Sequence, residues 1–457
     1  MSGRGEIRTV AVLDVGKTNV KLVLVDVAAG REVWSRVLPN RVRHDGLYPH
    51  ADTELIADFL LDGLAAVARD IDALSITTHG ATGALLAGDG LALPVLDYEH
   101  DGPDRVAEDY DRVRPAFAES FSPRLRGGLN LGAQLFWQAR SFPEAIARAD
   151  AFVTYPQYWA WRLTGVAATE ATSLGCHTDL WAPGRAGFSS LVARAGWSGL
   201  MAPTRPAFDG LGPLRPALAR RVGLARPLPV ACGIHDSNAS LLPHLDGGSA
   251  PKTVVSTGTW VVCFAVGGSL ERLDPARDTL ANVDAYGRPV PSARFMGGRE
   301  FDLLIGGTTA APDDSTLAAV LAGRVMVRPG FAPGSGPFPD HVGSWTVDPA
   351  MLTPPERTAV ASLYAALMTA TCLDLIGAAG PTVVEGPFAA NALYGEALLA
   401  LTGRPVAVST SGTGTSIGAA SLLAPIGPVR PSPVRPRPVL RPVFDAYAAQ
   451  WRARLNR

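Results

Sequence analysis

The sequence predicts an α/β protein built from two lobes of related topology. Strand patterns alternate with helix patterns along most of the 457 residues. Two stretches, 9–26 and 252–266, also share one pattern, in which a turn of small polar residues separates two apolar runs. We therefore expect a duplicated architecture with lobes at 1–244 and 245–457 facing each other across a central cleft.

Composition and charge exclude several classes of protein. The chain is 47% hydrophobic and 18% charged, which is typical of a soluble globular protein with a large core. A formal net charge of -1 argues against a nucleic acid or membrane surface as a partner recruited by bulk charge. Asp14 interrupts the first apolar run, so we expect no signal peptide. No apolar run approaches the roughly 18 residues of a transmembrane helix. A cytoplasmic location is the expectation.

Cysteine and lysine usage add two constraints. The cysteines lie far apart without metal-ligand spacing, which predicts reduced thiols. They are Cys176, Cys232, Cys263 and Cys372. Lysine is rare among the 41 basic residues, and every lysine falls in one of the two hairpin stretches. They are Lys17, Lys21 and Lys252. A compact ammonium acts as a point charge, and phosphate is one partner that suits it.

The first hairpin is a candidate phosphate-binding loop. Apolar residues 10–13 and 20–25 flank the turn 14–19, in which successive backbone N–H groups around Gly16 and the ammonium of Lys17 could cradle phosphate. Taken alone, this motif is better interpreted as an ordinary hairpin. The spacing of a Walker A loop is absent. The second hairpin aligns with the first at three positions: Asp14 with Ser256, Gly16 with Gly258, and Lys17 with Thr259.

Alternating elements follow the first hairpin. A helix is predicted at 53–69 and a strand at 73–77, which places His79 at a strand-to-loop junction. A histidine that only bonds its own loop is an equal alternative there. Residues 97–101 form a polar and aromatic cluster that suits sugar hydroxyls, or equally a solvated loop. A short strand at 151–153 and a helix at 155–163, ended by Gly165, complete this region.

The stretch around Asp236 is the strongest candidate site. A buried strand at 228–232 ends at Gly233, and the turn then presents His235, Asp236 and Ser237. Open α/β sheets bind ligands at the carboxyl ends of their strands. The alternative is that Asp236 and Ser237 merely cap the next helix.

The second half repeats the strand and helix alternation. A turn at 295–300 opens a helix, and a long helix is expected at 354–379. A buried strand at 382–385 precedes the turn 386–391, which could admit an adenine or ribose edge. Three more helices are predicted, at 392–401, at 416–423 after the turn 411–415, and at 444–455. Small residues at 416–423 allow close approach of another helix or of a nucleotide, with packing favoured. Proline and arginine enrich 425–442, for which packing on the protein surface is favoured over nucleic-acid binding.

Together these motifs resemble the FGGY carbohydrate kinases, whose fold is the two-lobed, actin-like (ribonuclease H-like) ATPase fold. The matching segments are Asp14 to Lys21, Ser256 to Trp260, Gly386 to Asn391, Gly233 to Asp236, and Tyr155 to Gly165. The resemblance extends from about residue 9 to residue 450. It implies an ATP- and Mg²⁺-dependent kinase that transfers the γ-phosphate to a sugar hydroxyl. It leaves the assembly state open, including a homodimer.

The resemblance also implies roles for individual residues. Asp236 would be the catalytic base and Asp14 the metal ligand. The ATP-binding set would be Gly16, Lys17, Thr18, Asn19, Lys21, Thr257, Gly258, Thr259, Gly298, Gly386 and Asn391. The substrate-binding set would be His79, Gly80, Asp97, His235, Asp236 and Ser237.

This chain departs from the family pattern at several positions. Lys17 stands where the family has a small hydroxyl or alanine, and Asn19 where serine is common. The adenosine turn is reduced to Gly386 with Pro387, and 97–99 does not match the family's sugar contact. The segment 235–237 looks most like the rhamnulokinase branch, which acts on a 6-deoxy-ketohexose.

The expected substrate is therefore a 6-deoxy-ketohexose such as L-rhamnulose or L-fuculose. The alternatives are another ketose or polyol, xylulose-like, or a different class of protein. That class is a non-catalytic, actin-like protein that binds ATP and sugar, and the presence of Asp236 argues against it. A hydrolase of the same superfamily would position a water instead of a sugar.

Overall fold

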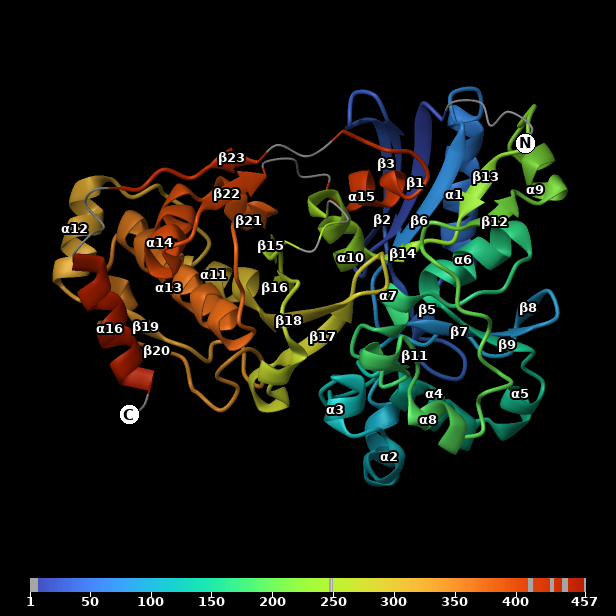
Figure 1. Cartoon of the computed structure of the whole chain (residues 1–457), viewed down its shortest axis with the longest axis horizontal. Helices are drawn as coiled ribbons and strands as arrows, with labels where there is room; N and C mark the ends of the chain where they lie inside the picture. The colour runs from blue at the N-terminus through green and yellow to red at the C-terminus, as the bar shows by residue number, and fades with distance from the viewer. Residues whose placement is uncertain are drawn as a thin grey trace. The chain divides into compact units, whose positions relative to one another are not determined.

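The chain folds into two compact units (Figure 1). The computed structural model describes residues 7–245, 248, 250–409, 414–427, 431–437 and 443–455. Unit 1 comprises Met1–Gly247, Ala281–Pro289 and Thr413–Pro428, and unit 2 comprises Gly248–Leu280, Val290–Gly412 and Val429–Arg457. A single boundary at residue 244 therefore does not describe the two later segments of unit 1.

Unit 1 is organised around a seven-stranded sheet with the order β12-β13-β6-β1-β2-β3, in which β14 also pairs with β6. The bounds are β12 Gly210–Pro213, β13 Pro229–Ala231, β6 Ala73–Thr78, β1 Thr9–Val15, β2 Asn19–Asp26, β3 Arg31–Pro39 and β14 Ile234–His235. These strands confirm the expected hairpin at 9–26 and the predicted strands at 73–77 and 228–232, which follow β1 in the sheet as β6 and then β13. β6 runs parallel to both β1 and β14, with Thr78 opposite Val15 and His235. Three parallel strands thus end at one edge, where the predicted polar residues follow them.

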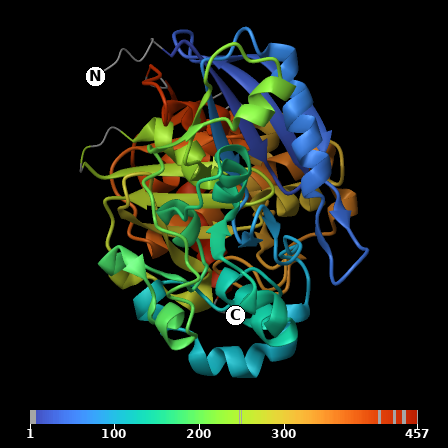
Figure 2. The same ribbon diagram turned by 90° about the vertical axis from the view of Figure 1, so that its right-hand side faces the viewer.

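Helices cover both faces of this sheet. Leu13 and Val15 of β1 pack in the core cluster that contains residues of α1 (Thr53–Val67) and α6 (Tyr155–Thr164). Figure 2 shows α1, in blue, beside the blue strands. Alternate residues such as Val12 pack instead in the cluster with residues of α10 (Asp236–Leu241) and α15 (Gly414–Ser421). This alternation is the period-two pattern of a strand buried on both faces.

Helix α15 (Gly414–Ser421) explains why a late segment belongs to unit 1. A Cβ added at Gly418 would lie 1.7 Å from the carbonyl oxygen of Ala239 in α10 (Asp236–Leu241), so only glycine permits this approach. The Ser75 hydroxyl of β6 also donates to the Ala419 carbonyl at 2.6 Å. The small residues of this helix therefore serve packing. Most of the predicted turn at 411–415 lies outside the described residues.

The remainder of unit 1 forms smaller sheets and short helices around a second, aromatic-rich core. The strands are β4 Val42–Arg43, β5 His50–Ala51, β7 Gly83–Ala87, β8 Gly90–Leu91, β9 Ala151–Thr154, β10 Trp181–Ala182 and β11 Gly187–Phe188. The helices are α2 Ala107–Val113, α3 Phe117–Ser120, α4 Leu131–Ser141, α5 Pro143–Ala147, α7 Ala171–Leu174, α8 Ser190–Arg194 and α9 Pro216–Arg221. The predicted strand at 151–153 and the helix at 155–163 are confirmed, and Gly165 ends the helix with φ of 90°.

Unit 2 repeats the arrangement with a seven-stranded sheet of the order β17-β18-β16-β15-β21-β22-β23, of which Ala281–Val283 in β17 and Pro289 in β18 are assigned to unit 1. The bounds are β17 Thr279–Val283, β18 Pro289–Phe295, β16 Val261–Val266, β15 Lys252–Thr257, β21 Thr382–Glu385, β22 Val406–Ser409 and β23 Ser432–Pro433. β15 runs antiparallel to β16 and parallel to β21, as β1 does to β2 and β6. The predicted hairpin at 252–266, the strand at 382–385 and the repeat between the two hairpins are confirmed.

Helices and a small two-stranded sheet complete unit 2. The bounds are α11 Gly297–Ile305, α12 Asp314–Ala322, α13 Pro354–Leu375, α14 Ala392–Thr402, α16 Val443–Leu455, β19 Val327–Arg328 and β20 Ser344–Trp345. The expected helix at 354–379 was too long, because Gly377 adopts φ of 61° just after α13. By length and composition α13 could cross a membrane, but 78% of its apolar window is buried inside the structure. Its apolar character therefore serves the core of unit 2.

The C-terminal helix α16 packs on unit 2 as expected. Phe444, Tyr447 and Trp451 are buried in the same core cluster as α13. The indole N–H of Trp451 donates to the Val327 carbonyl at 2.7 Å, and the Tyr447 hydroxyl donates to that of Val325 at 2.7 Å. These contacts account for the aromatic face of the helix.

Candidate functional site

Asp236 lies where β14 ends and α10 begins. Gly233 permits the preceding turn, because its φ is 92° and an added Cβ would lie 3.0 Å from the Ile76 carbonyl oxygen. The residue at the N-cap position is His235, and Asp236 is already the first helical residue. Its Oδ1 accepts from the backbone N–H of Ser237 at 2.6 Å and lies 3.3 Å from the Ser237 hydroxyl. Its side chain is 32% exposed, so the carboxylate is held by its neighbours yet accessible.

His235 orients this carboxylate. Its Nε2 lies 3.2 Å from Oδ1 of Asp236, and its Nδ1 lies 3.1 Å from the side-chain nitrogen of Asn238. Because an amide NH₂ only donates, Nδ1 accepts and Nε2 carries the proton donated to Asp236. Burial works against protonation of His235, but Cys176 and Asp236 outweigh it and raise its pKa. Gly80 packs directly on this ring, since an added Cβ would lie 2.6 Å from Nε2.

A second chain of hydrogen bonds fixes the backbone at His235. Its N–H donates to the Thr172 hydroxyl at 3.0 Å, and that hydroxyl donates to the Glu170 carboxylate at 2.5 Å. Glu170 also accepts from the backbone N–H groups of Thr172 and Ser173 at the start of α7. Burial of Glu170 raises its pKa to about 7, against which these hydrogen bonds act. No local pattern indicated Glu170 or Thr172, because each joins the site only through the fold, whereas Asn238 is a local partner three positions after His235.

Asp14 lies in β1 between Lys21 of β2 and Thr77 of β6. Burial, and next the nearby Asp236 carboxylate, raise the pKa of Asp14 to about 7, while Lys21 opposes the shift. The carboxylate forms no hydrogen bond with any residue that the structure describes. Two like charges, one of them unsatisfied, make a site that a divalent cation would relieve. The described residues contain no cluster of three or more metal-ligating side chains. Mg²⁺ is bound by one or two carboxylates together with phosphate and water, and Asp14 with the nearby Asp236 carboxylate fits such a donor set.

His79 follows β6 at the same sheet edge. Its Nδ1 lies 3.0 Å from the Gly80 carbonyl oxygen, so Nδ1 carries the proton and Nε2 is left as an acceptor. Burial lowers the pKa of His79, which keeps the ring neutral at pH 7. Its ring contacts those of Tyr98 and Tyr155, with centroid distances of 5.4 and 5.2 Å. A neutral acceptor of this kind suits a sugar hydroxyl.

Lys17 does not stand free in its turn. Its ammonium forms an ion pair with Asp97, lies 3.4 Å from a carboxylate oxygen of Glu99, and lies 4.5 Å from the Tyr98 ring centroid. The structure thus joins the first hairpin to the 97–101 cluster, a contact that the sequence did not predict.

The two hairpin turns offer backbone N–H groups in the same way. The N–H of Gly16 donates to the Asn19 carbonyl, and that of Gly258 donates to the Trp260 carbonyl, both at 2.9 Å. The next two N–H groups in each turn form no hydrogen bond with the described residues. They belong to Lys17 and Thr18 in the first turn and to Thr259 and Trp260 in the second. Thr18, Asn19 and Lys21 are exposed. Such paired free N–H groups are suited to phosphate oxygens.

Buried amide side chains that sequence reasoning missed support the loop around Tyr98. The Gln134 amide donates to the carbonyls of Ala81 and Gly128, both at 2.5 Å, and the Gly128 N–H donates to the Tyr98 carbonyl at 2.9 Å. Gln134 thereby ties the segment after Gly80 to the segment that carries Tyr98.

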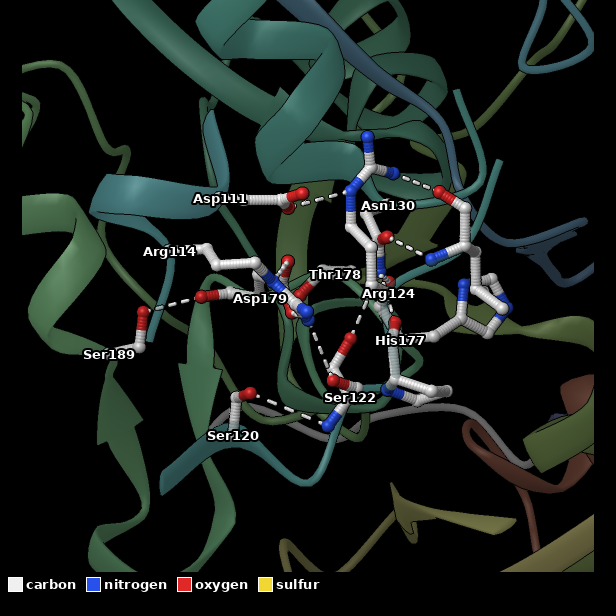
Figure 3. A network of polar contacts seen from close by, with 12 residues as sticks. Asp111, Arg114, Ser120, Ser122, Arg124, Asn130, His177, Thr178, Asp179 and Ser189 are labelled. Carbon is white, nitrogen blue, oxygen red and sulfur yellow. Dashed lines mark hydrogen bonds and ion pairs between the residues drawn. The ribbon is translucent and has the colours of Figure 1, made fainter. Parts of the chain in front are cut away.

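A larger polar network holds residues 122–130 in place (Figure 3). Arg114 forms a bidentate ion pair with the buried Asp179, with N–O distances of 3.1 and 2.9 Å, and also donates to the Ser122 carbonyl. The Asn130 amide donates to the Ser122 hydroxyl at 3.1 Å and to the His177 carbonyl at 2.9 Å. Bidentate buried pairs of this kind are geometrically specific. The network fixes the segment whose Gly128 contacts Tyr98.

Unit 2 contains a separate cavity of about 910 Å³. Four residues of the predicted ATP-binding set line it, namely Gly258, Thr259, Gly298 and Asn391. Phe301 and Phe388 also line it, with ring centroids 5.3 Å apart, and the sequence did not indicate either. The volume lies within the range of small-molecule sites. Aromatic walls beside a glycine turn suit the planar base of a nucleotide.

Three predicted ATP-binding residues of unit 2 fix the backbone beside this cavity, through a hydroxyl group, a glycine and a side-chain amide. The Thr257 hydroxyl donates to the Glu385 carbonyl at 2.5 Å and accepts from the Phe388 N–H at 3.0 Å. A Cβ added at Gly386, whose φ is 80°, would lie 1.9 Å from the Thr257 carbonyl oxygen. The side-chain oxygen Oδ1 of Asn391 accepts from the Tyr394 N–H at 3.1 Å and caps α14. Thr257 and Gly386 are not among the residues that line the cavity.

Comparisons with known proteins identify relatives over nearly the whole chain. A carbohydrate kinase from Novosphingobium aromaticivorans shares 37% identity, with 99% of each chain covered and a TM-score of 0.89. A xylulose kinase from Rhodospirillum rubrum shares 19% identity, with 98% of each chain covered and a TM-score of 0.77. A gluconate kinase from Lactobacillus acidophilus shares 14% identity, with 99% of this chain and 96% of that chain covered and a TM-score of 0.78.

Residues 249–431 match the family description "Carbohydrate kinase FGGY, C-terminal domain". No curated protein matches the chain. The last two structural neighbours are too distant in sequence to show more than the fold, which is the two-domain, actin-like α/β fold of these sugar kinases.

Proposed function

The chain belongs to the FGGY carbohydrate kinase family, and from this we propose that it transfers the γ-phosphate of ATP to a hydroxyl of a neutral ketose, with Asp236 as the general base. The observation that carries the proposal is the placement of Asp236. Its carboxylate lies at the end of β14 and accepts hydrogen bonds from His235 and Ser237, while a different residue occupies the N-cap.

Unit 1 supplies the groups for proton transfer in this proposal. The Asp236 carboxylate accepts the proton of the sugar hydroxyl while the hydroxyl oxygen attacks the γ-phosphorus of ATP and ADP leaves. Such a general base contributes roughly 10²- to 10⁴-fold in rate. His235 and Ser237 hold the carboxylate in place. Nε2 of the neutral His79 accepts a hydrogen bond from the sugar, and Gly80 keeps the backbone close enough to support His235.

The hairpins and the unit 2 cavity hold ATP in this proposal. The free N–H groups after Gly16 and Gly258, together with Thr18, Asn19 and Lys21, bind phosphate oxygens. Phe301 and Phe388 enclose the adenine, with Thr257, Gly386 and Asn391 shaping the turn beneath it. Mg²⁺, when bound, supplies charge neutralisation of the phosphates, and Asp14 is the residue that holds it.

The substrate is proposed to be an uncharged sugar. The charged groups placed on the sugar side carry more negative than positive charge, since they are Asp97, Glu99 and Asp236 against Lys17. A sugar acid would therefore be repelled. This argues against a substrate like that of the gluconate kinase neighbour. The segment 235–237 favours a 6-deoxy-ketohexose such as L-rhamnulose or L-fuculose. A pentulose such as xylulose is the second candidate, favoured by the fold shared with xylulose kinases.

A screen of purified protein tests this proposal. ADP release is measured with L-rhamnulose, L-fuculose, D-xylulose, polyols and gluconate, each with ATP and Mg²⁺, against a sugar-free background. We expect one neutral ketose to give turnover well above the background and gluconate to give none. ADP release that is the same without any sugar would indicate a hydrolase. ATP binding without ADP release for any compound would indicate the non-catalytic class.

We propose a cytoplasmic location for the protein. A homodimer is compatible with this proposal.

A further inference from the structure

We infer that Lys17 is a positioning residue of the sugar side, which holds the 97–99 loop against the first hairpin and thereby sets sugar affinity, instead of binding phosphate. This inference rests on the proposed function and deepens it. It also competes with the phosphate role implied by the family resemblance, at a position where this chain differs from the family pattern.

Carboxylates already neutralise the Lys17 ammonium. It pairs with Asp97, whose side chain is 9% exposed, and lies 3.4 Å from Glu99. Binding of Lys17 to phosphate would leave Asp97 largely buried without its cation, which is costly. Two carboxylates around one ammonium leave a net negative charge, which repels phosphate and accepts hydrogen bonds from neutral hydroxyls.

Lys17 also fixes an aromatic side chain beside the catalytic group. Its ammonium lies over one ring, that of Tyr98, at 4.5 Å from the centroid. The edge-to-face contact of Tyr98 with His79 has a centroid distance of 5.4 Å. His79 bonds the Gly80 carbonyl, and Gly80 packs on the His235 ring that donates to Asp236. Lys17 therefore connects to the proton-transfer group through the residues proposed to hold the sugar.

Hydrogen bonds that do not involve Lys17 hold the backbone of the 97–99 loop. The Asp97 N–H donates to the Pro49 carbonyl at 3.0 Å, and the Gly128 N–H donates to the Tyr98 carbonyl at 2.9 Å. Loss of the ammonium should therefore release the side chains of Asp97 and Tyr98 without unfolding the loop. The expected effect is on sugar binding and not on the fold.

The test compares Lys17→Met with Asp97→Asn, the double variant and a matched control. Arg221→Met is the control, because it removes an exposed cation that pairs with Asp58 at 2.8 Å in unit 1. The sugar is whichever of L-rhamnulose, L-fuculose and D-xylulose the wild type phosphorylates. KM for sugar and for ATP are measured, and the Kd of the non-hydrolysable analogue AMP-PNP is measured by calorimetry.

We expect Lys17→Met and Asp97→Asn each to raise KM for the sugar about 10-fold or more, with the double variant no worse than either single variant. KM for ATP and Kd for AMP-PNP should stay within about 2-fold of the wild type, as should all values for Arg221→Met. A 10-fold weaker AMP-PNP in Lys17→Met, or an unchanged sugar KM, would overturn the inference. If the wild type phosphorylates no sugar, the proposed function fails, while the AMP-PNP measurement still decides whether Lys17 binds phosphate.

Discussion

The Nε2 atom of His235 lies 3.2 Å from Oδ1 of Asp236, while the other ring nitrogen of His235 accepts from Asn238. The amide of Asn238 thus selects the tautomer that donates to the carboxylate. In other sites a buried partner orients an imidazole that acts directly. Here the His235 imidazole, fixed by Asn238, orients the Asp236 carboxylate.

His235→Ala should lower kcat about 10- to 100-fold and leave KM for ATP unchanged. The variant removes the donor that holds Oδ1 of Asp236, so the carboxylate samples unproductive orientations. Steady-state kinetics with the identified ketose measure both constants. His44→Ala, at an exposed histidine of the same unit, should behave as the wild type. Equal kcat in His235→Ala and wild type would show that the contact is incidental.

Gly80→Ala should impair turnover for a steric reason alone. Its added Cβ would lie 2.6 Å from Nε2 of His235, and Gly80 does not have a positive φ. The ring must move away from Asp236, so kcat should fall about 10-fold or more. Gly184→Ala is the matched control, because nothing lies within 4 Å of its added Cβ. Parallel kinetics and thermal melts compare them, and full activity of Gly80→Ala would contradict the placement of His235.

Gly258 of the second hairpin and Gly298 of α11 should separate ligand binding from folding. The nearest atom to a Cβ at Gly258 is 3.8 Å away, whereas a Cβ at Gly298 would lie 2.1 Å from the Gly258 carbonyl oxygen. Gly258→Ala should therefore melt as the wild type does but bind AMP-PNP at least 10-fold more weakly, because its Cβ blocks the phosphates. Gly298→Ala should lose thermal stability as well. Unchanged AMP-PNP affinity in Gly258→Ala would remove this turn from the nucleotide site.

Glu170 should make stability fall as pH rises. Burial raises its pKa to about 7, above its ordinary value of 4.5. The folded state therefore holds a proton that the unfolded chain releases, so unfolding becomes easier between pH 4.5 and 7. Relative to Glu170→Gln, the wild type should lose about 1–3 kcal/mol between pH 5 and pH 8. Melting temperatures of both proteins at the two pH values measure the difference.

Glu119→Gln provides the control for this pH effect. Although burial acts in the opposite direction, hydrogen bonds from Ser190 and the charge of Arg185 lower the pKa of Glu119. Its contribution is present above pH 4.5 and lost only on further acidification, so its melting difference from the wild type should be the same at pH 5 and pH 8. A pH-independent difference for Glu170→Gln too would mean that Glu170 is ionised in the folded protein at both values.

Local patterns in the sequence were sufficient to predict most elements and both hairpins. The apolar runs around Gly16 and Gly258 have the strand period. The strand before Asp236 ends at Gly233, and a glycine at that position indicates a turn. The end of α13 was misplaced because Ile376 continues the apolar pattern while the positive φ of Gly377 stops the helix. The expected helix extended to residue 379, just before Gly380, instead of ending before Gly377.

The supporting residues of the site could not be predicted, because they act across long separations in sequence. Gln134 bonds Ala81, 53 positions away, and Thr172 bonds His235, 63 positions away. No local period distinguishes such residues from ordinary core residues. Likewise, the sequence around Lys17 is the same whether its ammonium binds phosphate or pairs with Asp97, 80 positions away. Only the tertiary structure distinguishes the two.

Turnover by Asp236→Asn tests the central claim most directly. Asparagine keeps the size and shape of the side chain but cannot accept the proton, and as a helix cap it would serve about as well as aspartate. The variant should melt close to the wild type and bind AMP-PNP with similar affinity by calorimetry. We expect its kcat with the identified ketose to fall by about 10²-fold or more. A kcat close to that of the wild type would contradict the catalytic role of Asp236 and, with it, the proposed mechanism.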